Sequence, residues 1–229
     1  NRMNIYTVRQ ATQGLSEYIK KTGDTKKGVV IAYDSRNFSP EFALESAKVL
    51  CANGIKTYLF ESLRPTPELS FAVRHLGCVS GIVITASHNP AKYNGYKVYG
   101  EDGAQMAPDA ADAVTEEIRN IDMLRSIKLM DEREAVEKNL LIYIGEEVDK
   151  CYLDCVFDRR VNPDAIKDVS DSFSVVYTPF HGSGNMLVQR ILNMCGLKNL
   201  LVVKEQEQPD GNFPTVKSPN PEDKEGFTR

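Results

Sequence analysis

The sequence contains no uninterrupted apolar segment of about 18 residues, which is the length that a membrane-spanning helix requires. The beginning of the chain also lacks the basic, apolar and small-residue order of a secretory signal peptide. Its 28 lysines and arginines nearly balance its 32 aspartates and glutamates, and no long block of one sign occurs. Such a chain carries no bulk field that attracts nucleic acid or an anionic membrane. These absences predict a cytoplasmic protein without a nucleic-acid or membrane partner.

Cysteine is sparse, and the motifs of common cofactor sites are missing. The five cysteines are odd in number and form no CxxC pair, so we interpret them as reduced thiols and not as a disulfide framework. Cys151 and Cys155 could share a helix face, but two ligands without a neighbouring His or Cys pair are a weak basis for a metal site. No GxxxxGK[ST] loop occurs, nor a GxGxxG segment after a strand, so an ordinary nucleotide site has no support.

What the chain does contain is an alternation of helix and strand signals typical of α/β proteins. Its 229 residues are 41% hydrophobic and 26% charged, as in a folded chain of one or two domains. Apolar residues spaced by three and four predict a first helix that ends near Gly23 and Asp24. Short β-branched runs at 28–33, 57–60 and 81–85 predict buried parallel strands separated by helices. A strand at 96–99 and a turn at 100–103 add a hairpin, and a helix follows over 110–121.

The same alternation of helix and strand signals resumes after residues 122–146, a stretch without one clear hydrophobic period. We therefore predict two domains: residues 1–140, a three-layer α/β/α domain with a mixed, mostly parallel sheet, and residues 141–229, part of a second similar α/β domain. In the second we expect a helix around 148–156, a strand at 174–177, a helix at 187–195 and a strand at 200–203. Four prolines exclude regular structure from the tail at 208–221.

The segment Thr85-Ala86-Ser87-His88-Asn89-Pro90 carries the clearest chemical signal. It follows a buried strand, and ligands of open α/β sheets bind beyond the carboxyl ends of strands. A serine hydroxyl becomes a nucleophile when a base or a charge activates it, and His88, Lys97 or a bound cation could do so. The alternative is a turn whose polar side chains bond to their own backbone. Ser87 lacks the flanking glycines of G-x-S-x-G, which disfavours an acyl-transfer hydrolase.

The motif TASHNP, followed by YNGYKVYGEDGAQM, resembles the phosphoserine loop of the α-D-phosphohexomutase family, and its details are most similar to the bacterial phosphoglucomutase branch. Further segments resemble other landmarks of that family: residues 1–4, 33–36 and 65–67 in the first part of the chain, and 178–184, 213–215 and 219–221 in the second. The resemblance therefore spans nearly the whole chain and implies the N-terminal part of a longer protein.

The resemblance implies a phosphoglucomutase-type intramolecular phosphotransferase that interconverts glucose 1-phosphate and glucose 6-phosphate. Ser87 would carry the phosphoryl group, with His88 beside it, and Lys97 would act as general acid/base or as a charge clamp. Arg36 would hold the phosphoserine loop or a phosphate, or form an ion pair with a neighbour such as Asp34. Lys97 taken alone would be a solvated strand lysine. His181 could touch a ligand or order its own Gly-rich loop.

The family also implies Mg²⁺, bound by the phosphorylated Ser87 and by three aspartates of a DxDxDR-type loop. That loop is not in this chain, so we expect the chain alone to be inactive and to need the remaining C-terminal domains of its parent protein. The expected substrate is a hexose phosphate, and glucose 1,6-bisphosphate is the expected activator and intermediate. Alternatives are a phosphomannomutase or phosphopentomutase of the same family, or a non-catalytic relative that binds sugar phosphates.

Overall fold

The computed structural model describes residues 3–22 and 24–227. Asn1 and Arg2, half of the first resembling segment, and Gly23, at the expected end of the first helix, lie outside the described residues. The chain divides into two compact units. The first contains the residues up to Asp34 together with 38–86 and 93–145, and the second contains 35–37, 87–92 and the residues from Glu146 onward.

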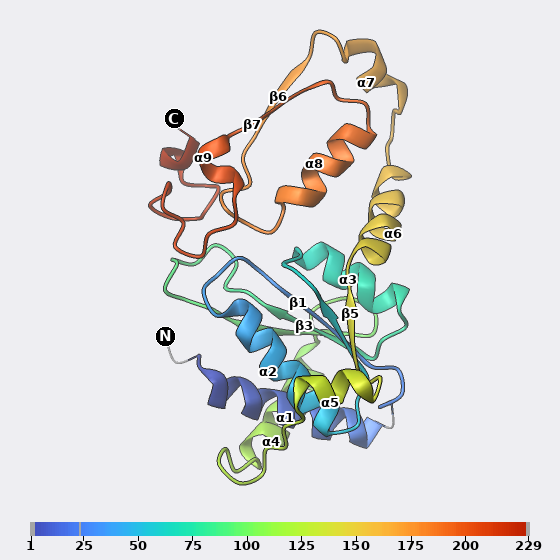
Figure 1. The fold of residues 1–229 in the computed structure, drawn as a ribbon, viewed down its shortest axis with the longest axis vertical. Helices are drawn as coiled ribbons and strands as arrows, with labels where there is room; N and C mark the ends of the chain where they lie inside the picture. Colours follow the sequence, from blue (N-terminus) through green and yellow to red (C-terminus); the bar gives the residue numbers. More distant parts are fainter. Residues whose placement is uncertain (1–2, 23, 228–229) are drawn as a thin grey trace. The chain divides into compact units, whose positions relative to one another are not determined.

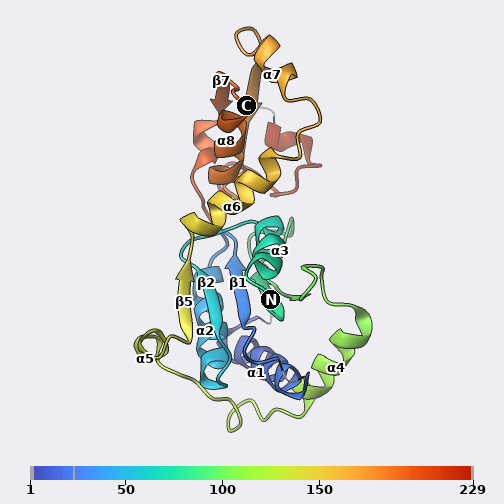
Figure 2. The same cartoon turned by 90° about the vertical axis from the view of Figure 1, so that its right-hand side faces the viewer.

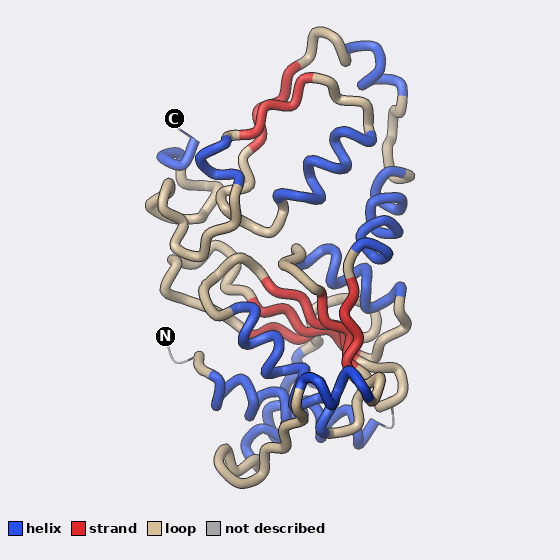
Figure 3. The backbone as a smooth tube through the Cα atoms, viewed as in Figure 1, coloured by secondary structure: helices blue, strands red, loops and turns tan. Residues whose placement is uncertain are grey.

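A five-stranded sheet forms the centre of the first unit among the described residues (Figure 3). Its strand order is β4 (Tyr96–Gly100), β3 (Ser80–Ile84), β1 (Val29–Tyr33), β2 (Thr57–Phe60), β5 (Leu141–Ile144). All neighbouring pairs are parallel except β3 and β4, which are antiparallel. Every residue of β1 and of β3 is buried, as expected for β-branched strands that are covered on both faces. Figure 2 shows β5, β2 and β1 side by side.

Helices cover both faces of this sheet (Figure 1). Val29 and Ile31 of β1 pack in one apolar cluster with Leu15 and Leu50, which belong to α1 (Ile5–Thr22) and α2 (Ser39–Ala52), and α4 (Pro108–Arg119) packs on α1. On the opposite face α3 (Thr66–His75) lies so close to β3 that a Cβ at Gly81 would meet a side chain of α3. The predicted three-layer α/β/α fold with a mixed, mostly parallel sheet is thus confirmed.

The expected helices and strands of the first unit are present, and two further elements were not expected. They are α5 (Glu132–Glu137) and β5, both within the stretch that shows no clear period. We expected the division between the domains after residue 140. Instead β5, which follows that residue, pairs with β2, and the first unit extends to Gly145. The physical reason is that β5 supplies the edge strand beside β2, a long-range pairing that no local pattern encodes.

The second unit contains a short parallel pair of strands and several helices. Its strands β6 (Ser174–Tyr177) and β7 (Asn199–Val202) pair with Ser174 opposite Asn199. The expected helices correspond to α6 (Glu146–Phe157) and α8 (Asn185–Met194), and two short helices were not expected: α7 (Asp164–Val169) and α9 (Lys204–Glu207). Residues 208–223 form neither helix nor strand, as their prolines predict (Figure 3), and a 3₁₀ helix follows at Lys224–Phe227.

None of the helices in the described part of the chain is long and apolar enough to cross a membrane.

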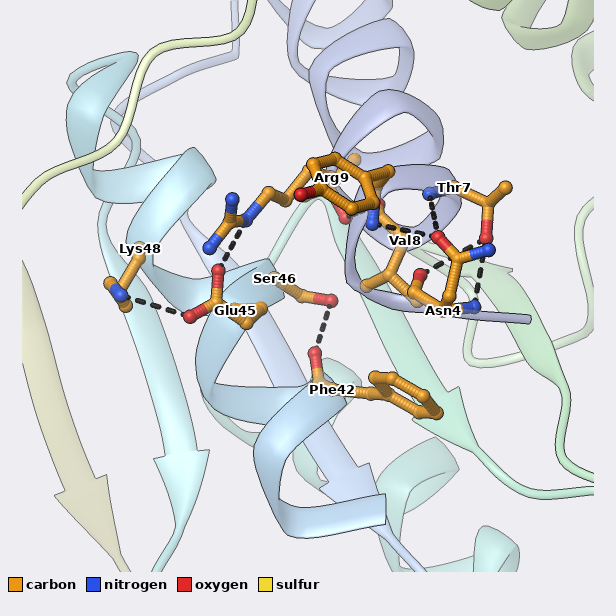
Figure 4. A network of polar contacts seen from close by, with 10 residues as sticks. Asn4, Thr7, Val8, Arg9, Phe42, Glu45, Ser46 and Lys48 are labelled. Atoms are coloured by element: carbon orange, nitrogen blue, oxygen red, sulfur yellow. Dashed lines mark hydrogen bonds and ion pairs between the residues drawn. The ribbon is translucent and has the colours of Figure 1, made fainter. Parts of the chain in front are cut away.

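A polar network connects α1 to α2 on one face of the sheet (Figure 4). Asn4 accepts hydrogen bonds from the backbone N–H groups of Tyr6 and Thr7 and so begins α1. Arg9 of α1 donates to the Glu45 carboxylate of α2 at 2.5 Å, and Lys48 donates to the same carboxylate at 2.9 Å. Burial raises the pKa of Glu45, but the hydrogen bonds from Arg9 and Lys48 outweigh it and hold that pKa below its usual range.

We expect Glu45→Gln to lower the free energy of unfolding at pH 7 by about 1 kcal/mol, because the variant loses two partly buried ion pairs. Since the folded-state pKa of Glu45 is depressed, its contribution is present above the unfolded pKa and disappears as the pH falls through the folded pKa. Urea unfolding of both proteins over a series of pH values from 7 downward measures this. The difference in unfolding free energy should be largest at pH 7 and should shrink as the pH falls, and a difference that does not change with pH would contradict the electrostatic account.

Candidate functional site

The candidate site begins where two adjacent parallel strands end. Tyr33, the last residue of β1, lies opposite Ile84, the last residue of β3, and the backbone N–H of Asp34 donates to the Ile84 carbonyl at 3.1 Å. Beyond these ends the chain enters two loops, residues 35–37 and 87–92. The carboxyl ends of parallel strands present their loops at one edge of the sheet, which is where ligands of open α/β sheets bind.

Within the first unit, side chains at this edge hold the backbone just after β1 and the backbone on either side of the loop that joins β3 to β4. Ser39 donates to the Asp34 carboxylate at 2.7 Å, and Asn94 donates to the Ser39 hydroxyl at 2.8 Å. The side-chain Oδ1 of Asn94 in turn accepts from the backbone N–H of Gly95, and the Gly95 carbonyl accepts from the backbone N–H of Thr85. A Cβ at Gly95 would lie 2.5 Å from the Thr85 carbonyl oxygen, so only glycine fits there. The network therefore anchors the residues on both sides of the Ser87 loop.

Ser87 and His88 are exposed, and the backbone of Ser87 is strained. Its φ of 55° lies in the left-handed region, which costs a residue with a side chain about 1–2 kcal/mol. The Ser87 hydroxyl lies 3.5 Å from His88 Nδ1, longer than an ordinary O–H···N hydrogen bond, so the pair is adjacent but not tightly bonded. A small movement would bring this imidazole to the serine oxygen as a proton acceptor.

Arg36 holds the loop that carries Ser87. Its Nη2 donates to the carbonyl oxygens of Ser87 at 2.8 Å and of Asn89 at 2.5 Å, and its Nη1 donates to the carbonyl of Pro90 at 3.0 Å. The side chain is buried, with 1% of the residue exposed. Contact with the loop, one of the three alternatives that the sequence leaves open for Arg36, is therefore present in the structure. Its role in binding a phosphate stays a prediction.

Lys97 lies in the first unit, on the strand that follows the loop. It stands opposite Val83 in the antiparallel pair of β4 and β3 and is partly buried. With Tyr96, Met106 and Ile118 it lines a hollow of about 340 Å³. The interpretation of Lys97 as an ordinary solvated strand lysine is weakened by this partial burial, and its catalytic role stays a prediction.

His181 is fully engaged within its own loop in the second unit. The residue is 4% exposed. Nδ1 lies 2.8 Å from the Gln208 carbonyl, which can only accept, so Nδ1 carries a proton. Nε2 lies 2.8 Å from the Thr215 hydroxyl. Because both ring nitrogens have partners, the loop-ordering role is the one that these contacts support.

The described residues do not make a magnesium site by themselves. Among residues 3–22 and 24–227, no three His, Cys, Asp or Glu side chains gather so that they could hold a metal ion. Mg²⁺ prefers six oxygen ligands in nearly octahedral geometry, and one serine phosphate would supply only part of such a set. We therefore derive no step through the metal, and the role of Ser87 as a metal ligand stays a prediction.

Three residues that contact this region were given no role in the site by the sequence. Ser39 and Asn94 extend the Asp34 network, and Phe213 places its ring over the Arg36 guanidinium, 5.3 Å from the ring centroid to Cζ. The turn residues Asp210-Gly211-Asn212 signal a tight bend just before Phe213. No local signal indicates which side chain the ring would cover.

Comparison with known proteins identifies the family to which the chain belongs. Two family models match the chain: "Phosphoglucomutase/phosphomannomutase, alpha/beta/alpha domain I" over residues 1–125 and domain II of the same family over residues 150–229. The chain belongs to the phosphoglucomutase/phosphomannomutase family. It is 40% identical over 227 residues to a phosphoglucomutase of Staphylococcus saprophyticus and 38% identical over 229 residues to one of Staphylococcus haemolyticus. In both cases 99% of this chain is covered, and the predicted family is confirmed.

The chain spans about 40% of the length of these phosphoglucomutase relatives. Solved structures share its fold. A putative phosphomannomutase from Thermus thermophilus aligns with a TM-score of 0.75 and 24% identity, over 94% of this chain and 45% of that one. The Paramecium phosphoglucomutase pp63/parafusin aligns with a TM-score of 0.71 and 19% identity, over 90% and 41%. At these identities the structural likeness supports the fold and not the substrate.

Proposed function

We propose that this chain is the phosphoserine-bearing part of a phosphoglucomutase-type enzyme, and that Ser87 is the residue that carries the phosphoryl group. One observation supports this above all. Ser87 is exposed on a strained loop at the carboxyl end of β3, and a buried arginine binds three carbonyls of that loop. The resemblance of this loop to the family's phosphoserine loop, together with relatives named phosphoglucomutase at 35–40% identity, favours glucose phosphates as substrates.

The proposed reaction consists of two phosphoryl transfers, first from Ser87 to the sugar phosphate and then from the bisphosphorylated sugar back to Ser87. The bond between Ser87 Oγ and phosphorus breaks, and a bond forms between phosphorus and the free hydroxyl oxygen of the sugar phosphate. The sugar hydroxyl loses its proton to a base, and Ser87 Oγ regains one, so the intermediate is glucose 1,6-bisphosphate and the enzyme is briefly unphosphorylated. After the bisphosphate reorients, its other phosphoryl group returns to Ser87 by the reverse process. The product is the isomeric monophosphate.

His88 and Lys97 have distinct proposed tasks. His88, 3.5 Å from the serine hydroxyl, is placed to exchange a proton with Ser87 Oγ when the loop tightens. Lys97 is proposed as the general acid/base for the sugar hydroxyl or as a positive charge that stabilises the transferring phosphoryl group. The aspartates that would hold the family's Mg²⁺ are proposed to lie in the remaining part of the parent protein.

Direct mapping of the phosphate tests this proposal. The full-length parent protein is incubated with glucose 1,6-bisphosphate, digested, and analysed by peptide mass spectrometry. We expect phosphate on Ser87, and we expect labelled phosphorus carried by Ser87 to pass into the sugar phosphate when glucose 1-phosphate is added. A phosphate that maps to another residue would overturn the proposal. A protein that binds glucose 1,6-bisphosphate but never becomes phosphorylated would instead identify a non-catalytic relative, and turnover of mannose or pentose phosphates in preference to glucose phosphates would identify one of the other mutases.

A further inference from the structure

A segment of the second unit far along the chain, residues 208–215, packs on the arginine that holds the Ser87 loop. Phe213 lies over the Arg36 guanidinium, 5.3 Å from ring centroid to Cζ. The neighbouring Asn37 donates a hydrogen bond to the Asn212 side chain at 2.9 Å. A Cβ at Gly211 would lie 2.4 Å from the Asn37 backbone nitrogen, so the two segments are in direct contact. We call residues 208–215 the cover segment.

The cover segment is itself held in one conformation. Phe213 has a φ of 50° and is 6% exposed, and its backbone N–H donates to the Asp210 carbonyl. The Asp210 carboxylate accepts from the backbone N–H of Asn212 at 2.8 Å. The His181 ring bonds to both ends of the segment, at the Gln208 carbonyl and the Thr215 hydroxyl. The ring of Phe213 is therefore presented to Arg36 by a fixed turn.

We propose that Phe213 is a positioning residue for Ser87, acting through Arg36. The inference rests on the function proposed above and adds a residue to its machinery. A positive charge over an aromatic face is attracted to the ring, more strongly where water is excluded. A covered guanidinium also forms stronger hydrogen bonds to carbonyls, because the local dielectric is low. Phe213 thus keeps Arg36 on the carbonyls of residues 87, 89 and 90 and keeps Ser87 in its strained conformation.

The geometry separates this role from simple packing. Arg36 is the link: it contacts the ring on one side and the Ser87 carbonyl on the other. Loss of the ring should therefore loosen residues 87–92 and should slow phosphoryl transfer. Phe213 makes no proposed contact with the sugar, so the KM for glucose 1-phosphate should change little.

The test compares Phe213→Met, Phe213→Ala and Phe213→Tyr in the full-length parent protein. Methionine keeps an apolar cover of similar volume but has no aromatic face, whereas tyrosine keeps the ring. We expect kcat to fall about 10-fold in Phe213→Met and about 30-fold in Phe213→Ala, with KM within threefold and with Phe213→Tyr near the parent. Amide hydrogen exchange in peptides covering 87–92 should become at least about tenfold faster in the first two variants, while peptides of β1 stay unchanged.

Phe173→Leu is the matched control, because Phe173 is an exposed phenylalanine of the same unit. It should leave both kcat and the exchange of residues 87–92 unchanged. If amides of β6 and β7 also exchange faster in Phe213→Ala, that variant is generally destabilised. In that case the Phe213→Met and Phe213→Tyr variants provide the test. Phe213→Met with kcat within twofold of the parent and unchanged loop exchange would overturn the inference. Hydrogen exchange of the loop can be measured without turnover. If the parent protein never becomes phosphorylated on Ser87 but the Phe213 variants still show faster exchange in residues 87–92, the proposed function is wrong and the positioning role of Phe213 is retained.

Discussion

Replacing Ser87 by alanine in the full-length protein is expected to lower the turnover of glucose 1-phosphate by at least about 1,000-fold, because the variant has no atom that can carry the phosphoryl group. The expected loss lies in kcat. Binding of the sugar phosphate should persist, since the substitution removes a single hydroxyl from an exposed residue. The fold should be unaffected for the same reason.

A coupled assay with a dehydrogenase that reports glucose 6-phosphate measures this effect. Ser126→Ala is a suitable control, because Ser126 is an exposed serine on a loop of the first unit. It should match the parent protein. Turnover of the Ser87→Ala variant within tenfold of the parent would show that another residue accepts the phosphoryl group, and the role given to Ser87 would be wrong.

Replacing Arg36 is expected to have the second-largest effect. Arg36→Ala leaves three loop carbonyls without their charged donor, and each such hydrogen bond contributes about 1.5–3 kcal/mol. Arg36→Lys keeps the charge, but a compact ammonium cannot reproduce the planar fork that reaches the carbonyls of residues 87, 89 and 90. We expect kcat to fall about 100-fold in Arg36→Ala and at least about 10-fold in Arg36→Lys, because a displaced loop misaligns the reacting serine.

The same variants decide between the roles that the sequence leaves open for Arg36. A loop-holding arginine affects kcat and the exchange of residues 87–92, whereas an arginine that binds substrate phosphate mainly raises KM. Steady-state kinetics of Arg36→Lys beside Arg159→Lys, an exposed arginine of the same unit, make the comparison. A KM raised more than tenfold with kcat unchanged would assign Arg36 to the phosphate and contradict the loop-holding role.

Most of the positive-φ residues with side chains lie in the second unit. Among the described residues there are six, of which Ser87, Phe180, His181 and Phe213 belong to the second unit and Phe38 and Asn139 to the first. Residues in such conformations persist only where their surroundings over-determine them, and they cluster at functional sites. Here the surroundings are specific: Arg36 binds the Ser87 carbonyl, and the His181 ring and backbone bind the segment that carries Phe213.

Most helices and strands of the first unit were predictable, because their signals lie in short stretches of neighbouring residues. Val29–Tyr33 and Ser80–Ile84 are short β-branched runs, and the three- and four-residue spacing of α1 places Leu15 and Ile19 on one face. β5 was missed, although Leu141–Ile144 is itself a short apolar run with β-favouring residues that ends at Gly145. Its pairing with β2, which makes it part of the first unit, is a long-range contact that local propensity does not determine.

The sequence by itself determined the class of fold, the family resemblance and the position of Ser87 and His88 at the end of a buried strand, because periodicity and motif spacing are properties of neighbouring residues. Only the tertiary structure decided what holds that loop. Arg36 precedes Ser87 by about fifty positions and Phe213 follows it by more than a hundred, yet one donates to the loop and the other covers the donor. A buried guanidinium needs partners for its donors and a cover against water, and the chain supplies these from segments that are brought together only when it folds.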